Sequence, residues 1–129
     1  MTDKMPTIVV VDDSKTSRAV YEHSVKPLAV NLISFDSSTK ALEYLQVNQP
    51  DLLFLDILMP VMDGLSLLRE LRKLPHHQDT PVIMVTSKDY AQDRHITNKL
   101  KAKEFAIKPI RFQEIRDLIC KHIDVKSQS

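Results

Sequence analysis

Residues 51–55 read DLLFL, a run that is apolar after its first residue, and the carboxylate Asp56 follows it directly. Four further apolar runs lie on either side of it along the chain: TIVVV at 7–11, VNLISF at 30–35, PVIMV at 81–85 and EFAI at 104–107. Short runs that are apolar at both alternating positions predict strands buried on both faces of a sheet. We therefore expect five strands, with gaps long enough for a helix and two turns.

Apolar residues in the gaps recur at helical spacing, i, i+3/4 and i+7. The repeats comprise Leu42 and Leu45; Leu67, Leu68, Leu71 and Leu74; and Ile115, Leu118, Ile119 and Ile123. The segment 88–102 is more polar, so we expect the core to hold its helix only lightly, through Ile96 and Leu100. Alternating strands and helices predict a doubly wound α/β fold with a parallel sheet. We expect one domain over residues 1–124 and a loose tail at 125–129.

The composition excludes several classes of protein. The chain has 129 residues, a formal net charge of +1, one glycine and one cysteine. The lone Gly64 excludes dinucleotide-binding and P-loop motifs, which need several residues without a Cβ, and the lone Cys120 excludes an internal disulfide and a cysteine-based zinc site. No apolar run approaches the roughly 18 residues of a membrane span, and Met1–Pro6 lacks the apolar stretch of a signal peptide. These features predict a cytoplasmic globular protein without membrane insertion.

Ligands of open α/β sheets bind beyond the carboxyl ends of the strands, so the residues after each predicted strand are site candidates. They are Asp12, Asp13 and Ser14 after the first run, Asp56 after the third, Thr86 and Ser87 after the fourth, and Lys108 and Pro109 after the fifth. Three carboxylates, a hydroxyl group and an ammonium group therefore converge on one edge of the sheet.

Three neighbouring carboxylates need a cation. Two of them about 4 Å apart cost roughly 4 kcal/mol at an effective dielectric constant near 20. Oxygen ligands without histidine or cysteine indicate a hard divalent ion, usually Mg²⁺. Alternatively, Asp12 and Asp13 only cap a helix. Against this, Ser14 can cap the helix alone, and Asp56 lies far away in the sequence.

The Asp56 carboxylate can serve as a metal ligand, a nucleophile or both. Attack on a phosphoryl group needs positive charge near the transferring oxygens, which Mg²⁺ and Lys108 would supply. The Thr86 hydroxyl and the backbone N–H of Ser87 are further donors. We hypothesise that the Lys108–Pro109 bond is cis and aims Lys108 back over the strand ends. The alternative for Lys108 is a solvated surface lysine.

Four separated segments, VVVDDS at 9–14, LLFLDILMPVMDGL at 52–65, VIMVTS at 82–87 and FAIKPI at 105–110, occur in this order along the chain. Together they resemble the signature segments of the receiver domain of bacterial two-component response regulators, the group that includes the chemotaxis regulators. The resemblance covers residues 7 to about 123. It implies a flavodoxin-like sheet of strand order 2-1-3-4-5 and phosphoryl transfer from the phosphohistidine of a histidine kinase to an aspartate.

The resemblance also implies roles for individual residues. Asp56 would be the phosphoacceptor. Asp13, Asp56 and the backbone carbonyl of Leu58 would bind Mg²⁺ directly, and Asp12 would bind it through water. Lys108 would contact the phosphoryl oxygens, with Thr86 as the switch hydroxyl and Phe105 as the switch aromatic. Two residues depart from the family pattern: Phe105 stands where many relatives have tyrosine, and Lys101 stands where they usually have glycine.

A basic region covers residues 88–122, which hold nine Lys or Arg and five Asp or Glu, a net charge of +4. In the family this face commonly meets a downstream protein target or output domain, or forms a phosphorylation-linked homodimer; the alternative is a solvated helical surface. The upstream partner would be a sensor histidine kinase or phosphotransfer protein. With few aromatics among the basic residues and no recognition helix, we expect no direct contact with nucleic acid.

Two other functions compete with a phosphorylated switch, which would catalyse only its own phosphorylation and dephosphorylation. A pseudo-receiver would bind partners without phosphorylation, but the complete acidic set and Lys108 disfavour it. A phosphatase of the haloacid dehalogenase type also uses an aspartate nucleophile, but it needs a second aspartate where this chain has Leu58. His76 and His77 are adjacent but lack a third ligand, so we expect structural roles for them.

Overall fold

The computed structural model describes residues 5–125, so most of the tail expected at 125–129 lies outside the described residues. Five strands form one parallel sheet in the order β2-β1-β3-β4-β5. The strands are β1 (Thr7–Val11), β2 (Asn31–Phe35), β3 (Leu52–Asp56), β4 (Val82–Thr86) and β5 (Glu104–Ile107). The helices are α1 (Lys15–Ser24), α2 (Ser38–Leu45), α3 (Gly64–Lys73), α4 (Ala91–Lys99) and α5 (Phe112–His122), with a short 3-10 helix at Pro75–His77. The expected doubly wound fold is confirmed.

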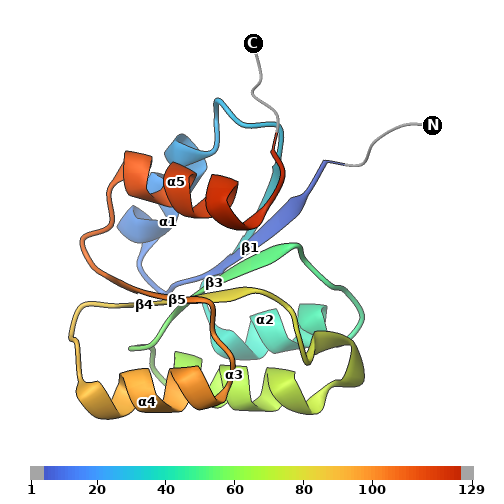
Figure 1. The fold of residues 1–129 in the computed structure, drawn as a ribbon, viewed down its shortest axis with the longest axis vertical. Helices are drawn as coiled ribbons and strands as arrows, with labels where there is room; N and C mark the ends of the chain where they lie inside the picture. Colours follow the sequence, from blue (N-terminus) through green and yellow to red (C-terminus); the bar gives the residue numbers. More distant parts are fainter. Residues whose placement is uncertain (1–4, 126–129) are drawn as a thin grey trace.

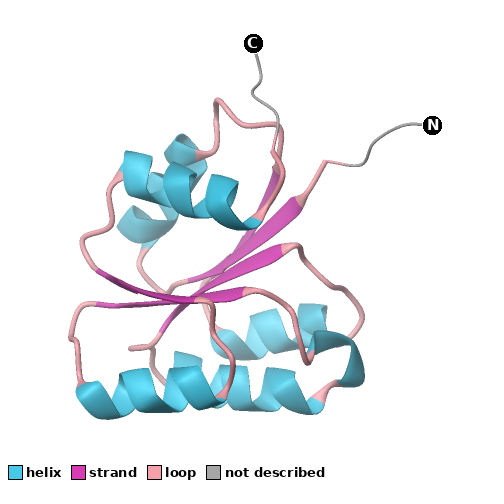
Figure 2. Cartoon of the chain, in the orientation of Figure 1, coloured by secondary structure: helices cyan, strands magenta, loops and turns pink. Residues whose placement is uncertain are grey.

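The helices cover both faces of the sheet (Figures 1 and 2). Helices α1 and α5 lie side by side on one face, and α2, α3 and α4 lie on the other. Alternate strand residues supply two separate cores: Ile8 and Phe54 pack on the first face, and Val9 and Leu55 pack on the second. Every residue of β3 is buried, as its continuous apolar run predicts for a central strand of a parallel sheet.

Helix α4 is the most loosely packed of the described helices, as its polar sequence predicts. Of its nine residues only Thr97 is buried, while Ile96 is partly buried against the second core. Beyond its end, Lys101 has a left-handed backbone with φ 63°, which a non-glycine residue adopts at a cost of roughly 1–2 kcal/mol. Arg72 of α3 stabilises this turn by donating hydrogen bonds to the Leu100 carbonyl at 2.8 Å and the Lys101 carbonyl at 3.3 Å.

The close approach of α3 to the end of β3 explains why residue 64 is glycine. A Cβ on Gly64 would lie 2.2 Å from the Asp56 carbonyl oxygen, so only glycine allows α3 to begin this close to the end of β3. The Gly64 N–H donates to the Ile57 carbonyl at 2.9 Å and joins the two segments. Val61, in the loop after β3, is fully exposed and has φ 69°, an unfavourable conformation for a β-branched side chain.

His77 has the structural role that we expected. It is fully buried, and its Nε2 donates to the carbonyls of Leu45 at 2.6 Å and Asn48 at 2.9 Å. Its Nδ1 therefore accepts from the Thr80 hydroxyl at 2.8 Å. Burial lowers the pKa of His77, so the ring is neutral and joins α2 to the segment before β4. Within the described residues, no helix is long and apolar enough to cross a bilayer.

Candidate functional site

The carboxyl ends of β1 and β3 bring two buried carboxylates together. Val11 pairs with Leu55 in the parallel register, so Asp12 and Asp56, the next residue of each strand, lie side by side. Asp12 is 1% exposed and Asp56 is 5% exposed, whereas Asp13 is exposed. One carboxylate oxygen from each of the three lies within 4.8 Å of the others. The acidic cluster expected from the strand ends is therefore present.

Asp12 is also part of the start of α1. Its Oδ1 accepts the N–H of Ser14 at 2.9 Å, and its backbone carbonyl accepts a hydrogen bond from Arg18 Nη1 at 2.8 Å. Ser14 caps the helix itself, because its hydroxyl accepts the N–H of Ser17 at 3.2 Å. The helix therefore does not need the other oxygen of Asp12, nor the Asp13 or Asp56 side chains, as a cap. Helix capping alone leaves the convergence of three carboxylates unexplained.

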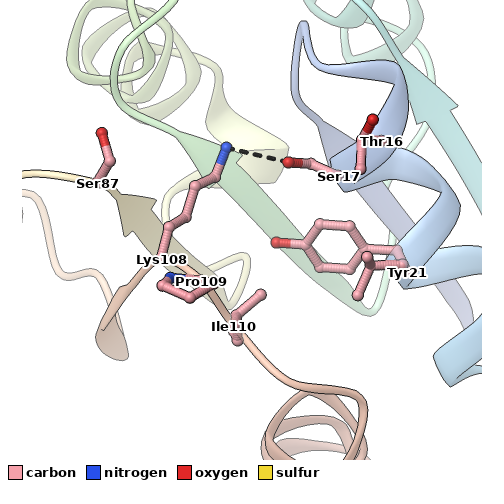
Figure 3. Close-up of a pocket in the computed structure, with 8 residues that line it drawn as sticks. Thr16, Ser17, Tyr21, Ser87, Lys108, Pro109 and Ile110 are labelled. Atoms are coloured by element: carbon pink, nitrogen blue, oxygen red, sulfur yellow. Dashed lines mark hydrogen bonds between the residues drawn. The ribbon is translucent and has the colours of Figure 1, made fainter.

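Lys108 enters the site from the end of β5. Its Nζ lies 2.8 Å from Asp12 Oδ2 and 3.2 Å from Asp56 Oδ2. It also lies 3.4 Å from the Ser17 hydroxyl, the contact drawn as a dashed line in Figure 3. The Lys108–Pro109 bond is cis, as hypothesised. Lys108 is thus bound among the carboxylates rather than free at the surface.

The electrostatics of the site favour a further cation. Burial, followed by the neighbouring Asp12 charge, raises the pKa of Asp56, although Lys108 opposes the rise. Burial alone would lower the pKa of Lys108, but the two carboxylates outweigh it and the net shift is upward. Lys108 is therefore a permanent cation at neutral pH, yet one ammonium group cannot balance three carboxylates.

The donor set fits a hard divalent ion. The buried Asp12 Oδ2 has Lys108 Nζ at 2.8 Å, but that ammonium group is shared with Asp56, whose Oδ2 lies 3.2 Å from it. A buried oxygen of this kind is costly unless a cation satisfies it. Three carboxylates without histidine or cysteine suit Mg²⁺ best. Leu58, whose carbonyl the family resemblance adds to the ligands, lies two residues beyond Asp56, and its role stays a prediction.

The other expected site residues are Thr86, Ser87 and Phe105, and each has different surroundings. Thr86 ends β4 and is buried, and its hydroxyl accepts the N–H of Lys88 at 3.2 Å. Ser87 is exposed and lines a cavity together with Lys108. Phe105 lies on β5 opposite Met84 and packs half-buried against the second core.

Two residues of α1 belong to the site but were missed from the sequence. Ser17 contacts Lys108, and Tyr21 lies four residues later on the same face of the helix. Both line a cavity of about 320 Å³ next to Lys108, and Figure 3 shows the Tyr21 hydroxyl pointing towards the lysine. Burial, then the charges of Asp12 and Asp56, raises the pKa of Tyr21. The i, i+4 spacing of these residues after the acidic pair was the available signal.

The chain is similar to known proteins over most of its length. Residues 8–120 match the response regulator receiver domain family. The cyclic di-GMP phosphodiesterase response regulator RpfG of Xanthomonas campestris is 35% identical over 124 residues, which cover 95% of this chain and 33% of that protein. The probable transcriptional regulator ycf27 of Cyanophora paradoxa is 32% identical over 108 residues, covering 84% and 44%. The chain thus spans less than half the length of these relatives.

Solved structures share the fold. The chemotaxis protein CheY4 of Vibrio cholerae superposes with a TM-score of 0.86 at 21% identity, covering 93% of this chain and 100% of that one. The receiver domain of the sensor histidine kinase PA1611 from Pseudomonas aeruginosa has a TM-score of 0.83 at 21% identity, covering 94% and 99%, and holds a magnesium ion in its active site cleft. With the family match over most of its length, the chain belongs to the response regulator receiver domains of two-component signalling systems.

Proposed function

We propose that this receiver domain accepts a phosphoryl group on Asp56 and thereby switches a protein-interaction face. The observation that carries the proposal is the position of the Asp56 carboxylate, buried at the end of β3, 3.2 Å from Lys108 Nζ and within the three-carboxylate cluster. The donor would be the phosphohistidine of a sensor histidine kinase or phosphotransfer protein, acting in the cytoplasm.

The reaction needs little covalent chemistry from the protein. An Asp56 oxygen attacks phosphorus, the phosphorus–nitrogen bond to the donor imidazole breaks, and an acyl phosphate forms while the imidazole leaves with the bonding electron pair. Hydrolysis reverses the state when water attacks phosphorus and the Asp56 carboxylate leaves. Lys108 stabilises the charge on the transferring oxygens through its ammonium group. Mg²⁺, held by Asp13 and Asp56 with the Leu58 carbonyl, and by Asp12 through water, would neutralise the remaining charge.

The switch follows from the added charge, which is nearly two negative units with strong acceptor oxygens. The Thr86 hydroxyl and the backbone N–H of Ser87 would turn towards these oxygens. Phe105 would fill the space that Thr86 leaves, and the loosely packed α4 would move with it. The affected face, around residues 88–122, would bind a downstream protein, an output domain or a second copy of the chain.

Intact mass spectrometry tests the proposal after incubation with acetyl phosphate and Mg²⁺. We expect a single phosphoryl adduct that fails to form with chelator and in Asp56→Asn. Asp63→Asn is the matched control: Asp63 caps α3 by accepting the Ser66 N–H at 2.8 Å, and asparagine caps equally well. The absence of an adduct with any donor would favour a pseudo-receiver. Multiple-turnover release of phosphate from small phosphoesters would favour a phosphatase.

A further inference from the structure

The Phe105 ring is covered by a side chain from α4. The guanidinium carbon of Arg94 lies 4.4 Å from the centroid of the ring, within the range of a cation–π interaction. The same guanidinium is bound at its edge by Asp89, with Nε donating to Oδ1 at 2.6 Å and Nη2 donating to Oδ2 at 3.0 Å. A bidentate pair of this kind fixes the plane of the guanidinium as well as its position.

Asp89 belongs to the loop 87–90, which directly follows Thr86 at the end of β4. In this loop the Lys88 N–H donates to the Thr86 hydroxyl at 3.2 Å, and Asp89 is the next residue. A short series of contacts therefore runs from Thr86 through the loop to Asp89, then to Arg94 and the Phe105 ring. On α4, the buried Thr97 hydroxyl donates to the Arg94 carbonyl at 2.9 Å and steadies the backbone that carries the arginine.

We propose that Asp89 and Arg94 form a clasp that holds the Phe105 ring in the resting arrangement and opens on phosphorylation. The inference rests on the proposed function of Asp56. In the arrangement seen here, the Thr86 hydroxyl is bonded within its own loop rather than to Asp56. Its turn towards a phosphoryl group breaks the Lys88 contact and shifts Asp89. Arg94 then loses its fixed partner, and the ring is released to rotate inward.

The strength of the clasp suits a reversible switch. Both charged side chains are nearly half exposed, at 46% for Arg94 and 45% for Asp89. Exposed ion pairs contribute little to stability, so a few hydrogen bonds to a phosphoryl group are enough to displace this one. Arg94 is a positioning residue here: it touches the switch ring and not the reacting atoms. Phenylalanine in place of the usual tyrosine suits this arrangement, because the ring face, not a hydroxyl group, makes the contact.

Fluorine NMR with 4-fluorophenylalanine tests the clasp directly. The chain has four phenylalanines, and Phe105→Leu identifies the Phe105 signal by its loss. We expect Arg94→Ala and, more weakly, Asp89→Asn to shift the Phe105 signal towards its position in wild type with Mg²⁺ and beryllofluoride. Lys99→Ala, which removes a charge from the same helix without touching the ring, should leave the signal in place.

The affinity for beryllofluoride, a phosphoryl mimic, tests the coupling to phosphorylation. Loss of an exposed cation–π contact should make Arg94→Ala bind it roughly two- to fivefold more tightly than wild type. Adding Asp89→Asn should have little further effect, since both act through one clasp. An unchanged Phe105 signal in Arg94→Ala would overturn the clasp, and an unchanged affinity would overturn its coupling. If wild type binds no beryllofluoride, the proposed function and the coupling fail together, while the signal still decides whether Arg94 holds the ring.

Discussion

Replacing Gly64 by alanine tests how the end of β3 is held. The new Cβ would lie 2.2 Å from the Asp56 carbonyl oxygen, 2.9 Å from its carbon and 3.0 Å from Ile57 Cα. All three are backbone atoms, so no side chain can rotate away. The start of α3 and the end of β3 must separate, which stretches the 2.9 Å hydrogen bond from Gly64 to Ile57. Overpacking of this kind costs about 1–3 kcal/mol, and a clash with backbone belongs at the upper end.

Urea denaturation measures this cost as a lower midpoint at unchanged slope. Because the clash displaces Asp56 itself, we also expect slower phosphorylation by acetyl phosphate in protein that is still fully folded. Ser66→Ala, two residues along the same helix, is the control for a general effect on α3. A Gly64→Ala protein as stable as wild type, and phosphorylated at the same rate, would refute the close approach described here.

Three further outcomes are expected. Val61→Gly should stabilise the protein by about 1 kcal/mol, seen as a higher urea midpoint, because it relieves the left-handed strain at φ 69°; an unchanged midpoint would contradict the strain. Mg²⁺ at about 100 times its dissociation constant should stabilise the fold by about 2.7 kcal/mol in thermal denaturation, and Asp13→Asn, which removes a carboxylate that α1 does not need, should abolish most of this gain. Since burial lowers the pKa of His77 below its ordinary 6.5, the unfolded chain binds this proton more tightly. His77 thus contributes to the free energy of unfolding above about pH 6.5, and this contribution is lost as the pH falls below that value. Urea denaturation at several pH values measures the loss. If His77→Gln loses as much stability over this pH range as wild type, another group is responsible.

The sequence predicts the parts of this protein that depend on local periodicity. Apolar runs locate the strands to within one residue, and parallel strands bring their last residues to one edge, so Asp56 and Lys108 can be found without coordinates. The strand order, in contrast, came from the resemblance to receiver domains. Periodicity says which residues are buried in strands but does not say which strands are neighbours.

The residues that the sequence did not reveal depend on tertiary surroundings. Tyr21 is polar at its tip, and only the folded arrangement, in which its ring packs on Phe54 of β3, shows that it lines the cavity beside Lys108. The left-handed backbone at Val61 contradicts the preference of its side chain, so no local rule predicts it. Arg94 belongs to a polar helix where an arginine is unremarkable until the ring beneath it is seen.

The hydrogen bonds from Arg72 to the Leu100 and Lys101 carbonyls hold the residues that directly follow α4. They tie the carboxyl end of α4 to α3, whereas its amino end follows the loop 87–90, whose contacts would change in the proposed switch. The nine residues of α4, at about 1.5 Å per residue, give the helix a length of roughly 13 Å. In the proposed switch, α4 would therefore pivot near Leu100, with its largest displacement at Tyr90 and Ala91. A partner that distinguishes the phosphorylated from the unphosphorylated domain should therefore bind at the amino end of α4.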